Sequence, residues 1–441
     1  MKIELAKKVM EREEGLNHLI ATVVPAKSEG EKTKPNAILL VLDNSGSMSA
    51  GLDGRWGYHH QPVIQRSFNQ QHGFVQHNQV EEQHVSKLEC VKQASEKLVD
   101  MLGEGDKLSL VSFSDIGQEE YPLTSITMDE KFKMKDRIRQ LSTRGSTNVS
   151  SGLDVAYNQI TENKNLKDTH DIKIILLSDG HANYGIREAD AMATYVKKFE
   201  QVGASISTIG VGNDYNSYYM ETIATASGGM FYHLKTMDML SDILTKELHE
   251  LAVLTMKNAK VSLRFDEGLH FESNLNDLPS QGGNVFFVGN VISEMKLAFG
   301  FSTIEEVEKD ALSIHISFEY DNEKGEHHTV EKEIVVGLTD EEDVEVNKEV
   351  VKYVQMLTEA QVKKEALRHY ETMDTTASAT SIQKGMGVLR SMKAGYGINT
   401  DEMEQGFTQL QADIRTQSIQ ANDVKEMYSS TYRVLRNSKE E

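Results

Sequence analysis

The sequence predicts an α/β fold, in which a doubly wound sheet is followed by a β-sandwich and a C-terminal helical segment. Two short, mainly apolar runs, at residues 37–42 and 172–178, suit strands buried on both faces, and each stops at an aspartate. Amphipathic helical patterns alternate with these and further strands, which is typical of a sheet covered by helices on both faces. Beyond residue 255 the pattern changes to short alternating strands, and no proline after Pro279 interrupts the later helical stretches.

Length and composition are those of a globular protein with more than one domain. At 441 residues the chain exceeds one ordinary domain, so two or three are expected. Its hydrophobic content of 39% and charged content of 26% are typical of soluble proteins. The formal net charge of −21 argues against a nucleic-acid backbone or an anionic membrane as the main partner.

Cysteine usage and hydropathy indicate the compartment. The single cysteine, Cys90, excludes an internal disulfide framework and fits a reducing environment. The amino terminus lacks a long apolar core, and no segment approaches the roughly 18 apolar residues that a membrane span needs. We therefore expect a cytoplasmic protein without anchor or signal.

Residues 1–35 are expected to hold an N-terminal arm and one strand. Residues 1–16 are charged and fit a short helix or a loose arm, whereas residues 18–25 fit a strand. A linker rich in lysine, glutamate and glycine separates this strand from the one at 37–42. The strand at 18–25 is free to join the sandwich, which would place both flanks of the α/β unit in one domain.

Residues 36–254 are expected to form the α/β domain. Its helices are predicted at about 86–102, 129–141, 148–161, 188–202, 218–226 and 237–254, and its later strands at 107–113, 121–127, 172–178, 205–212 and 230–234. Ser86 and Glu89 form a capping box that starts the first helix. Residues 49–86 lack any sustained period and hold five of the fifteen histidines, namely His59, His60, His72, His77 and His84. We expect a long loop inserted at the mouth of the first strand of the domain.

Two further parts follow the α/β domain. Residues 255–338 are expected to form the β-sandwich, with short strands at 260–265, 283–291, 294–301, 312–320 and 329–336. Residues 339–441 are expected to form the helical segment, with helices at about 346–372, 379–393 and 401–436 that pack as a small bundle on the sandwich.

Oxygen-bearing side chains gather where the strands of the α/β domain end. Asp43, Ser45 and Ser47 follow the first strand, Asp179 ends a similar one, and Thr147 stands in a turn that opens a helix. In an open parallel sheet such ends meet at the edge where ligands bind. Two carboxylates and three hydroxyls are hard oxygen ligands with little net charge, which suit Mg²⁺ or Mn²⁺ better than zinc or iron.

These residues resemble a known family. The Asp-x-Ser-x-Ser signature at Asp43, Ser45 and Ser47, the Gly-Ser-Thr-Asn threonine Thr147 and the Ser-Asp-Gly aspartate Asp179 are similar to the metal-ion-dependent adhesion site (MIDAS) of von Willebrand factor type A (vWA) domains. The resemblance covers roughly residues 36–254, and all five positions of the motif are present. The further layout resembles bacterial and plant-type intracellular vWA proteins, in which a sandwich and helices follow the domain.

The resemblance implies a Rossmann-like vWA domain that binds Mg²⁺ and a protein partner. The two serines and the threonine would contribute neutral oxygens to the ion, and the two aspartates would act directly or through ordered waters. The ion would keep an open octahedral position, which a glutamate or aspartate of the partner would fill. The expected function is that of a scaffold or adaptor that breaks no bond in a substrate.

Three other functions remain open from the sequence. The protein is alternatively an accessory subunit of an AAA+ ATPase or of a stress-response kinase and phosphatase system, although the chain has no ATPase phosphate-binding motif of its own. A Mg²⁺-dependent phosphoryl-transfer enzyme would use Asp43 as nucleophile, but such a mechanism usually wants a second acid where this chain has Ser45. RNA binding is known for some vWA proteins, and the acidity of this chain disfavours it.

Several other features are interpreted as structural. The histidine spacings in 49–86 do not match a compact set of transition-metal ligands, so we expect a loop beside the MIDAS that helps to select the partner or shields the ion. Cys90 is expected to be a small, semi-buried helix residue, and Asp115 a loop cap. Gly210 and Gly212 lack the third glycine of a dinucleotide-binding turn and are expected to belong to a loop of the sheet.

Overall fold

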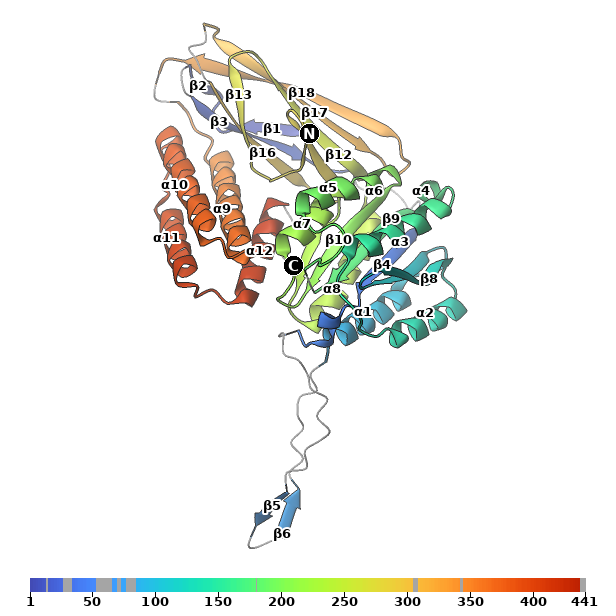
Figure 1. Ribbon diagram of the computed structural model, residues 1–441. Coiled ribbons are helices and arrows are strands. Elements are labelled where there is room, and N and C mark those ends of the chain that lie inside the picture. Colours follow the sequence, from blue (N-terminus) through green and yellow to red (C-terminus); the bar gives the residue numbers. More distant parts are fainter. Residues whose placement is uncertain are drawn as a thin grey trace.

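The structure is a computed structural model that describes residues 1–12, 15–26, 34–52, 66–69, 73–76, 85–179, 181–303, 308–341 and 344–436. Figure 1 shows three parts: an α/β unit, a pair of β-sheets above it, and a row of helices along one side of both. The domain limits expected from the sequence, at 36–254, 255–338 and 339–441, remain predictions.

The α/β unit is built on a six-stranded sheet with strand order β11-β10-β9-β4-β7-β8. Only β8 runs antiparallel to its neighbour within this sheet. The first strand of the unit, β4, lies in the middle, and its side chains from Ala37 onward are buried, as its apolar sequence predicts. The strands are β4 (Asn36–Asp43), β7 (Lys107–Phe113), β8 (Gly117–Ser125), β9 (Asp171–Ser178), β10 (Ala204–Val211) and β11 (Phe231–Leu234).

Helices cover both faces of this sheet, which confirms the doubly wound fold predicted from the sequence. Alternate side chains of β4 point to opposite cores: Leu39 and Val41 to one, Leu40 and Leu42 to the other. The first core is closed mainly by α3 (Val149–Glu162), α5 (Ala189–Val196), α6 (Lys198–Gln201) and α7 (Ser217–Ala226), with the short α4 (Leu166–Thr169) at its end. The second is closed by α1 (Lys87–Met101), α2 (Met128–Gln140) and α8 (Met237–Val253).

Two further sheets face each other across one hydrophobic core. Strand β3 (Leu16–Val23), where the sequence predicted a strand at 18–25, pairs with β16 in the smaller sheet, so sequence from both sides of the α/β unit meets there. The smaller sheet has the order β1-β3-β16-β13, with β1 (Lys2–Leu5), β13 (Leu269–Asn274) and β16 (Met295–Thr303). The larger has the order β14-β15-β12-β17-β18-β2, with β2 (Val9–Glu11), β12 (Met256–Phe265), β14 (Ser280–Gly282), β15 (Val285–Val291), β17 (Ala311–Asp321) and β18 (His327–Thr339).

The N-terminal segment differs from the expected helix or loose arm. It forms strands β1 and β2, which join one sheet each. The buried side chains of Leu5 and Met10 contribute to the core between the two sheets. These strands are only four and three residues long, so their apolar pattern is too brief to predict a strand.

The helical segment comprises α9 (Lys348–Glu371), α10 (Thr375–Tyr396), α11 (Asp401–Thr416) and α12 (Ala421–Leu435). The single helix expected at 401–436 is therefore wrong. Gln417 adopts a left-handed conformation with φ of 51° and ends α11, so that α12 turns back toward α9. The bundle also packs more widely than expected, because Tyr428 and Tyr432 of α12 belong to a core of the α/β unit.

A buried ion pair and a hydrogen bond join the helical segment to α7 of the α/β unit. Lys364 of α9 donates to Glu221 of α7 at 2.7 Å, and both side chains are buried. Glu371 of α9 accepts from the Ser217 hydroxyl at 2.6 Å and pairs with Lys425 of α12 at 2.9 Å. The α/β unit and the helical segment thus share one polar, buried contact.

Most of the histidine-rich segment expected as a loop at 49–86 lies outside the described residues, including the five histidines. The segment begins at the end of η1 (Gly46–Ser49), a single turn of 3₁₀ helix. Strands β5 (Arg66–Asn69) and β6 (Gly73–Gln76) pair antiparallel.

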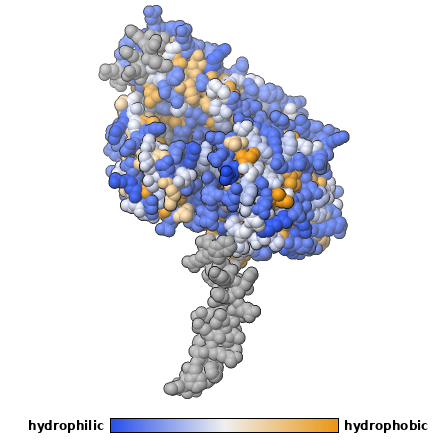
Figure 2. Space-filling model, in the orientation of Figure 1, coloured by the Kyte–Doolittle hydropathy of each residue, from blue (hydrophilic) through white to orange (hydrophobic). Residues whose placement is uncertain are grey.

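The surface of the molecule is largely hydrophilic on the face that Figure 2 shows, with apolar side chains in small, separate patches. Among the described helices, none combines the length and the apolar character needed to cross a membrane.

Candidate metal centre

Two buried carboxylates lie side by side at one edge of the α/β sheet. Asp43 is the last residue of β4, Asp179 follows β9, and these two strands are parallel neighbours. Both side chains have 0% exposure. The chain order reverses here, since β7 lies on the other side of β4, and this is the position where open α/β sheets bind their ligands.

A continuous chain of hydrogen bonds links four of the five predicted site residues. The backbone N–H of Ser45 donates to Oδ1 of Asp43 at 2.8 Å. The hydroxyls of Ser45 and Ser47 are 3.0 Å apart, and Ser47 donates to Oδ1 of Asp179 at 2.8 Å. Ser178 completes the arrangement by donating to Oδ2 of Asp43 at 2.6 Å. The structure therefore brings Asp43, Ser45, Ser47 and Asp179 together.

The loop that carries Thr147 contacts both the serine loop after β4 and the loop after β9 that begins with Asp179. The N–H of Gly46 donates to the carbonyl of Gly145 at 3.1 Å, and the carbonyl of Thr147 accepts from Asn183, in the Asp179 loop, at 2.8 Å. Thr147 is 2% exposed, and its hydroxyl makes no hydrogen bond to the other four site residues among the described contacts.

Asp115 supports this loop, in the capping role expected from the sequence. Its Oδ1 accepts from the N–H of Ser146 at 2.9 Å. Gly145 has φ of +57°, and a Cβ there would lie 2.3 Å from the Asp115 carboxylate. Glycine is thus required both by the left-handed backbone and by the close approach of Asp115.

The two neighbouring buried carboxylates of the centre favour a nearby positive charge. Burial and the neighbouring charge of Asp179 raise the pKa of Asp43 from 3.8 to about 7, although hydrogen bonds from Ser178 and Ser45 oppose the shift. Two buried carboxylates that repel each other are stabilised by a positive charge placed between them. A divalent ion would supply that charge.

The donor set fits a hard divalent cation. In an octahedral ion with oxygen ligands at about 2.1 Å, adjacent ligands are about 3.0 Å apart, and the hydroxyls of Ser45 and Ser47 already have a separation of 3.0 Å. In the part of the chain that the structure describes, no group of three histidine, cysteine, aspartate or glutamate side chains is arranged to hold a metal ion. Hydroxyl and carboxylate oxygens are donors that suit a hard divalent cation.

Sequence reasoning missed one charged residue of the centre. Lys87, the first residue of α1, is 0% exposed, and its Nζ lies 2.8 Å from Oδ2 of Asp179 and 3.1 Å from Oδ2 of Asp214. The sequence showed only that a lysine in the first turn of a helix is electrostatically unfavourable, because it opposes the helix dipole. The sequence analysis treated this position only as part of the Ser86 capping box, whose serine does accept from the N–H of Glu89.

Cys90 has the structural role expected, although it is buried rather than semi-buried, and of the two glycines expected in a loop only Gly212 lies in one. Burial raises the pKa of the Cys90 thiol to about 11, so that it stays protonated at neutral pH and is a poor nucleophile. Gly210 belongs to β10, and Gly212 lies in the loop after it with φ of +77°. Neither contributes a phosphate-binding turn.

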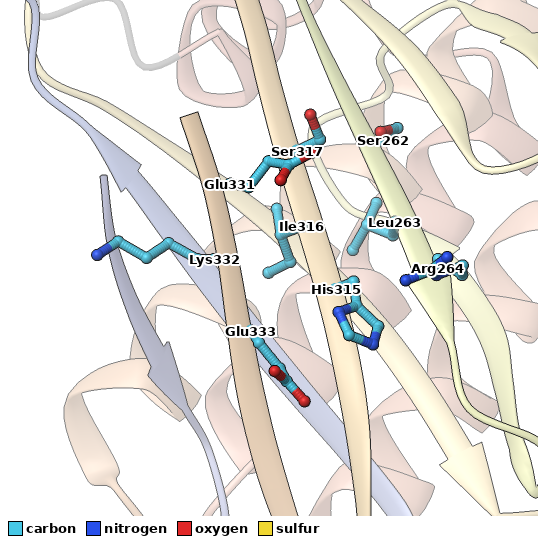
Figure 3. Close-up of a pocket in the computed structure, with 9 residues that line it drawn as sticks. All are labelled: Ser262, Leu263, Arg264, His315, Ile316, Ser317, Glu331, Lys332 and Glu333. Carbon is cyan, nitrogen blue, oxygen red and sulfur yellow. The ribbon is translucent and has the colours of Figure 1, made fainter. Parts of the chain in front are cut away.

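A hollow lies away from this centre, on the outer face of the larger of the two facing sheets. It has a volume of about 490 Å³. Arg264, His315 and Glu333 come from three adjacent strands, β12, β17 and β18, and lie side by side along it (Figure 3). Arg264 and Glu333 are exposed and His315 is partly exposed, so the hollow is a solvated strand surface rather than a built site.

The fold and the strand-end site together define a doubly wound α/β domain of the kind that holds a metal ion above its sheet. The family model described as von Willebrand factor type A domain matches residues 82–246, which lie within the α/β unit, and this unit has the vWA fold. The matched residues include Thr147 and Asp179, and they begin after the loop of Asp43, Ser45 and Ser47.

Two curated relatives match part of the chain. The uncharacterized protein YfbK of Escherichia coli (strain K12) is 30% identical over 181 residues, which cover 41% of this chain and 31% of that protein. Inter-alpha-trypsin inhibitor heavy chain H2 of Sus scrofa is 24% identical over 268 residues, or 60% of this chain and 25% of that protein. This chain thus spans less than a third of either protein.

Two solved structures share the fold over nearly the whole chain. A von Willebrand factor type A protein from Catenulispora acidiphila has a TM-score of 0.65 at 13% identity and covers 98% of this chain and 96% of its own. The ArnB paralog VWA2 from Sulfolobus acidocaldarius has a TM-score of 0.57 at 15% identity and covers 100% of this chain and 99% of its own. The three-part architecture therefore occurs in other proteins that contain a vWA domain.

Proposed function

We propose that this chain is a protein-interaction module, a scaffold or adaptor, that binds a partner's aspartate or glutamate through Mg²⁺ or Mn²⁺. The cation would be held at a MIDAS made of Asp43, Ser45, Ser47, Thr147 and Asp179. vWA domains commonly mediate protein–protein interaction and often bind a divalent metal at such a site, which supports the assignment of this class of function.

The observation that carries the proposal is the hydrogen-bond chain from Asp43 through Ser45 and Ser47 to Asp179. It holds two neutral hydroxyls between two buried carboxylates, and the docked Thr147 loop adds a third hydroxyl at the same edge. When bound, the cation supplies a positive charge with a coordination position for an outside oxygen. The three hydroxyls neutralise none of that charge, so a carboxylate is the partner group that the centre favours.

Catalysis is not part of the proposal. A phosphoryl-transfer role for Asp43 would require one of its oxygens to attack phosphorus, and the hydrogen bonds that Oδ1 accepts from Ser45 and Oδ2 from Ser178 make both oxygens weaker nucleophiles. Ser45 stands where the second acid of such a mechanism is expected. vWA domains are generally interaction modules rather than enzymes, in accord with this arrangement.

Metal titration tests the function directly. We expect Mg²⁺ or Mn²⁺ to raise the melting temperature of the purified chain, because an ion that binds only the folded state stabilises it by mass action. Ser45→Ala removes one of the proposed ligands and should weaken this response at least ten-fold in metal concentration.

Ser49→Ala provides the matched control. Ser49 lies in the same loop, but its hydroxyl donates to the carbonyl of Gly46 at 2.7 Å and is exposed. This variant should respond to the metal like the wild type. The proposal would be wrong if the wild type did not respond, or if Ser45→Ala and Ser49→Ala responded alike.

The location and the nature of the partner are further parts of the proposal. The single cysteine and the acidic composition support a cytoplasmic protein. A partner that uses an acidic residue should be displaced by chelator, and its own Asp→Asn or Glu→Gln variant should no longer bind. Binding that survives both treatments would exclude the MIDAS as the contact.

A further inference from the structure

A buried ammonium group stands beside the proposed metal ligands. The Nζ atom of Lys87 is 2.8 Å from Oδ2 of Asp179, and both side chains have 0% exposure. A second carboxylate, that of Asp214, lies 3.1 Å from the same Nζ, and its side chain is 61% exposed. The ammonium group thus has one partner inside the centre and one at the surface.

The surrounding backbone leaves room for this lysine. Gly212 adopts φ of +77°, and a Cβ on it would lie 2.7 Å from Cε of Lys87. The lysine stem therefore passes directly over a glycine of the loop that follows β10. Gly212 and Asp214 both belong to this loop, and Asp179 lies after the neighbouring strand β9. The ammonium group is therefore held between the two loops.

The charge of the centre depends on this group. Asp43 and Asp179 together carry two negative charges when both are ionised, which a divalent cation would neutralise. Lys87 adds one positive charge at a site where water does not screen it, whereas the charge of Asp214 is largely exposed to solvent. A cation-loaded centre with Lys87 has a net positive charge, and one without it is neutral.

We propose that Lys87 tunes the metal centre: it weakens the hold on the divalent cation and strengthens the hold of the loaded centre on a partner's carboxylate. This role rests on the proposed function. The lysine acts by repelling the cation across Asp179 and by attracting the incoming negative charge. It also occupies Oδ2 of Asp179, which leaves Oδ1, the oxygen that Ser47 contacts, facing the serine loop.

The competing explanation is that Lys87 only fastens α1 to the sheet. A fastening role predicts that its loss impairs every property of the site in the same direction. The tuning role predicts effects of opposite sign on the cation and on the carboxylate. Measuring both constants on one variant therefore separates the two explanations.

The test uses Lys87→Met in the full chain, with Mn²⁺ and acetate as probes. Mn²⁺ affinity is measured from the electron paramagnetic resonance signal of the free ion. Acetate affinity is measured from the relaxation of ¹³C-acetate by protein-bound Mn²⁺. We expect the dissociation constant for Mn²⁺ to fall about ten-fold or more and that for acetate to rise about ten-fold, since removal of a buried unit charge changes each interaction by at least that factor.

The metal-free protein gives a second readout. Without Lys87 the buried carboxylates lose their internal cation, so Lys87→Met should melt at a lower temperature than the wild type in the absence of metal. Saturating Mn²⁺ should then raise its melting temperature by more than it raises that of the wild type.

Lys173→Met is the matched control. Lys173 lies at the opposite end of the same strand as the centre, β9, and forms an equally buried pair with Glu247 at 2.7 Å. Its removal should lower stability and leave both binding constants within a factor of two of the wild type. Asp214→Asn complements it, because it removes the exposed partner of Lys87 and should shift both constants in the direction opposite to Lys87→Met.

The outcomes distinguish this role from the proposed function. A wild-type chain that binds no Mn²⁺ overturns the proposed function, and the role of Lys87 with it. A wild-type chain that binds Mn²⁺, combined with a Lys87→Met variant in which both constants rise or neither changes, overturns the tuning role alone. If Lys87→Met does not fold, the uncharged but polar Lys87→Gln variant decides: constants equal to those of the wild type there overturn the role.

Discussion

The buried carboxylate of Asp43 makes metal binding depend on pH in a way that the structure allows us to work out. Its pKa of about 7 in the metal-free chain, against 3.8 in water, corresponds to about 4 kcal/mol that disfavours the charged form. At pH 6 about nine tenths of the metal-free chain has a protonated Asp43, and at pH 8 about one tenth. A divalent cation requires the carboxylate, so we expect binding to release about 0.9 proton at pH 6 and about 0.1 at pH 8.

The apparent affinity should therefore fall about ten-fold from pH 8 to pH 6. The stability of the metal-free chain should change in the opposite sense. A folded-state pKa above the unfolded one means that Asp43 destabilises the fold increasingly as the pH rises from 3.8 to about 7. Added metal should reverse that loss.

Isothermal titration calorimetry with Mn²⁺, in two buffers of different ionisation enthalpy, measures the released protons. Ser178→Ala provides a directional check, because the hydrogen bond from Ser178 lowers the pKa of Asp43. Its loss should raise that pKa further and move the midpoint of the pH profile upward by roughly one unit. An affinity independent of pH, or a midpoint that moves downward in Ser178→Ala, would refute the reasoning.

Three further predictions concern the frame around the site. Burial lowers the pKa of His18 from 6.5 to about 4, so its stabilising contribution is complete above pH 6.5, and about 3 kcal/mol of the free energy of unfolding is lost by pH 4. Urea midpoints at the two pH values should show this loss, and His18→Gln should reduce it. Gly145→Ala should weaken Mn²⁺ binding, because φ is +57° and the added Cβ would lie 2.3 Å from a carboxylate oxygen of Asp115. Gly283→Ala is the control and should leave Mn²⁺ binding unchanged, since Gly283 has the same φ but no atom within 4 Å of the added Cβ. Lys364→Met should destabilise the chain by about 3–5 kcal/mol, because it removes the ion-pair partner of the buried Glu221 carboxylate. Lys363→Met, which breaks only a partly exposed pair with Glu359, should cost less than about 1 kcal/mol. Equal urea midpoints for the two variants would contradict this.

The sheet and the candidate site were predictable because their signals are local. Each of the strands β4 and β9 is a short run whose buried character shows in the sequence; β4 ends in Asp43, and β9 is followed at once by Asp179. Parallel strands bring such ends to one edge without any knowledge of tertiary contacts. The serine loop lies within one short stretch of sequence, and the turn expected at Thr147 begins at Gly145, which has a positive φ in the structure.

The contribution of Lys87 was not predictable in the same way, because its partners are distant in the chain. Asp179 lies 92 residues away and Asp214 127 residues away. A lysine at the start of a helix is ordinarily solvated, and only the packing of α1 beneath the sheet edge excludes water from this one. The sequence showed an electrostatically unfavourable position without showing what compensates it.

The packing of α12 illustrates the same limit for a whole element. The sequence predicted helix over these residues, as part of a single helix at 401–436, and the amphipathic face of α12 with Val424, Tyr428 and Tyr432 is buried. The choice of surface depends on groups that no local pattern connects: Tyr428 donates to Glu221 of α7 at 2.5 Å, and Phe231 of β11 makes edge contacts with both tyrosine rings. A buried carboxylate on α7 could not remain unpaired, so the side of the α/β unit that carries it required a cover with hydroxyl and ammonium groups. That requirement, rather than hydrophobicity alone, explains why the C-terminal helix packs on the vWA domain as well as on the neighbouring helices.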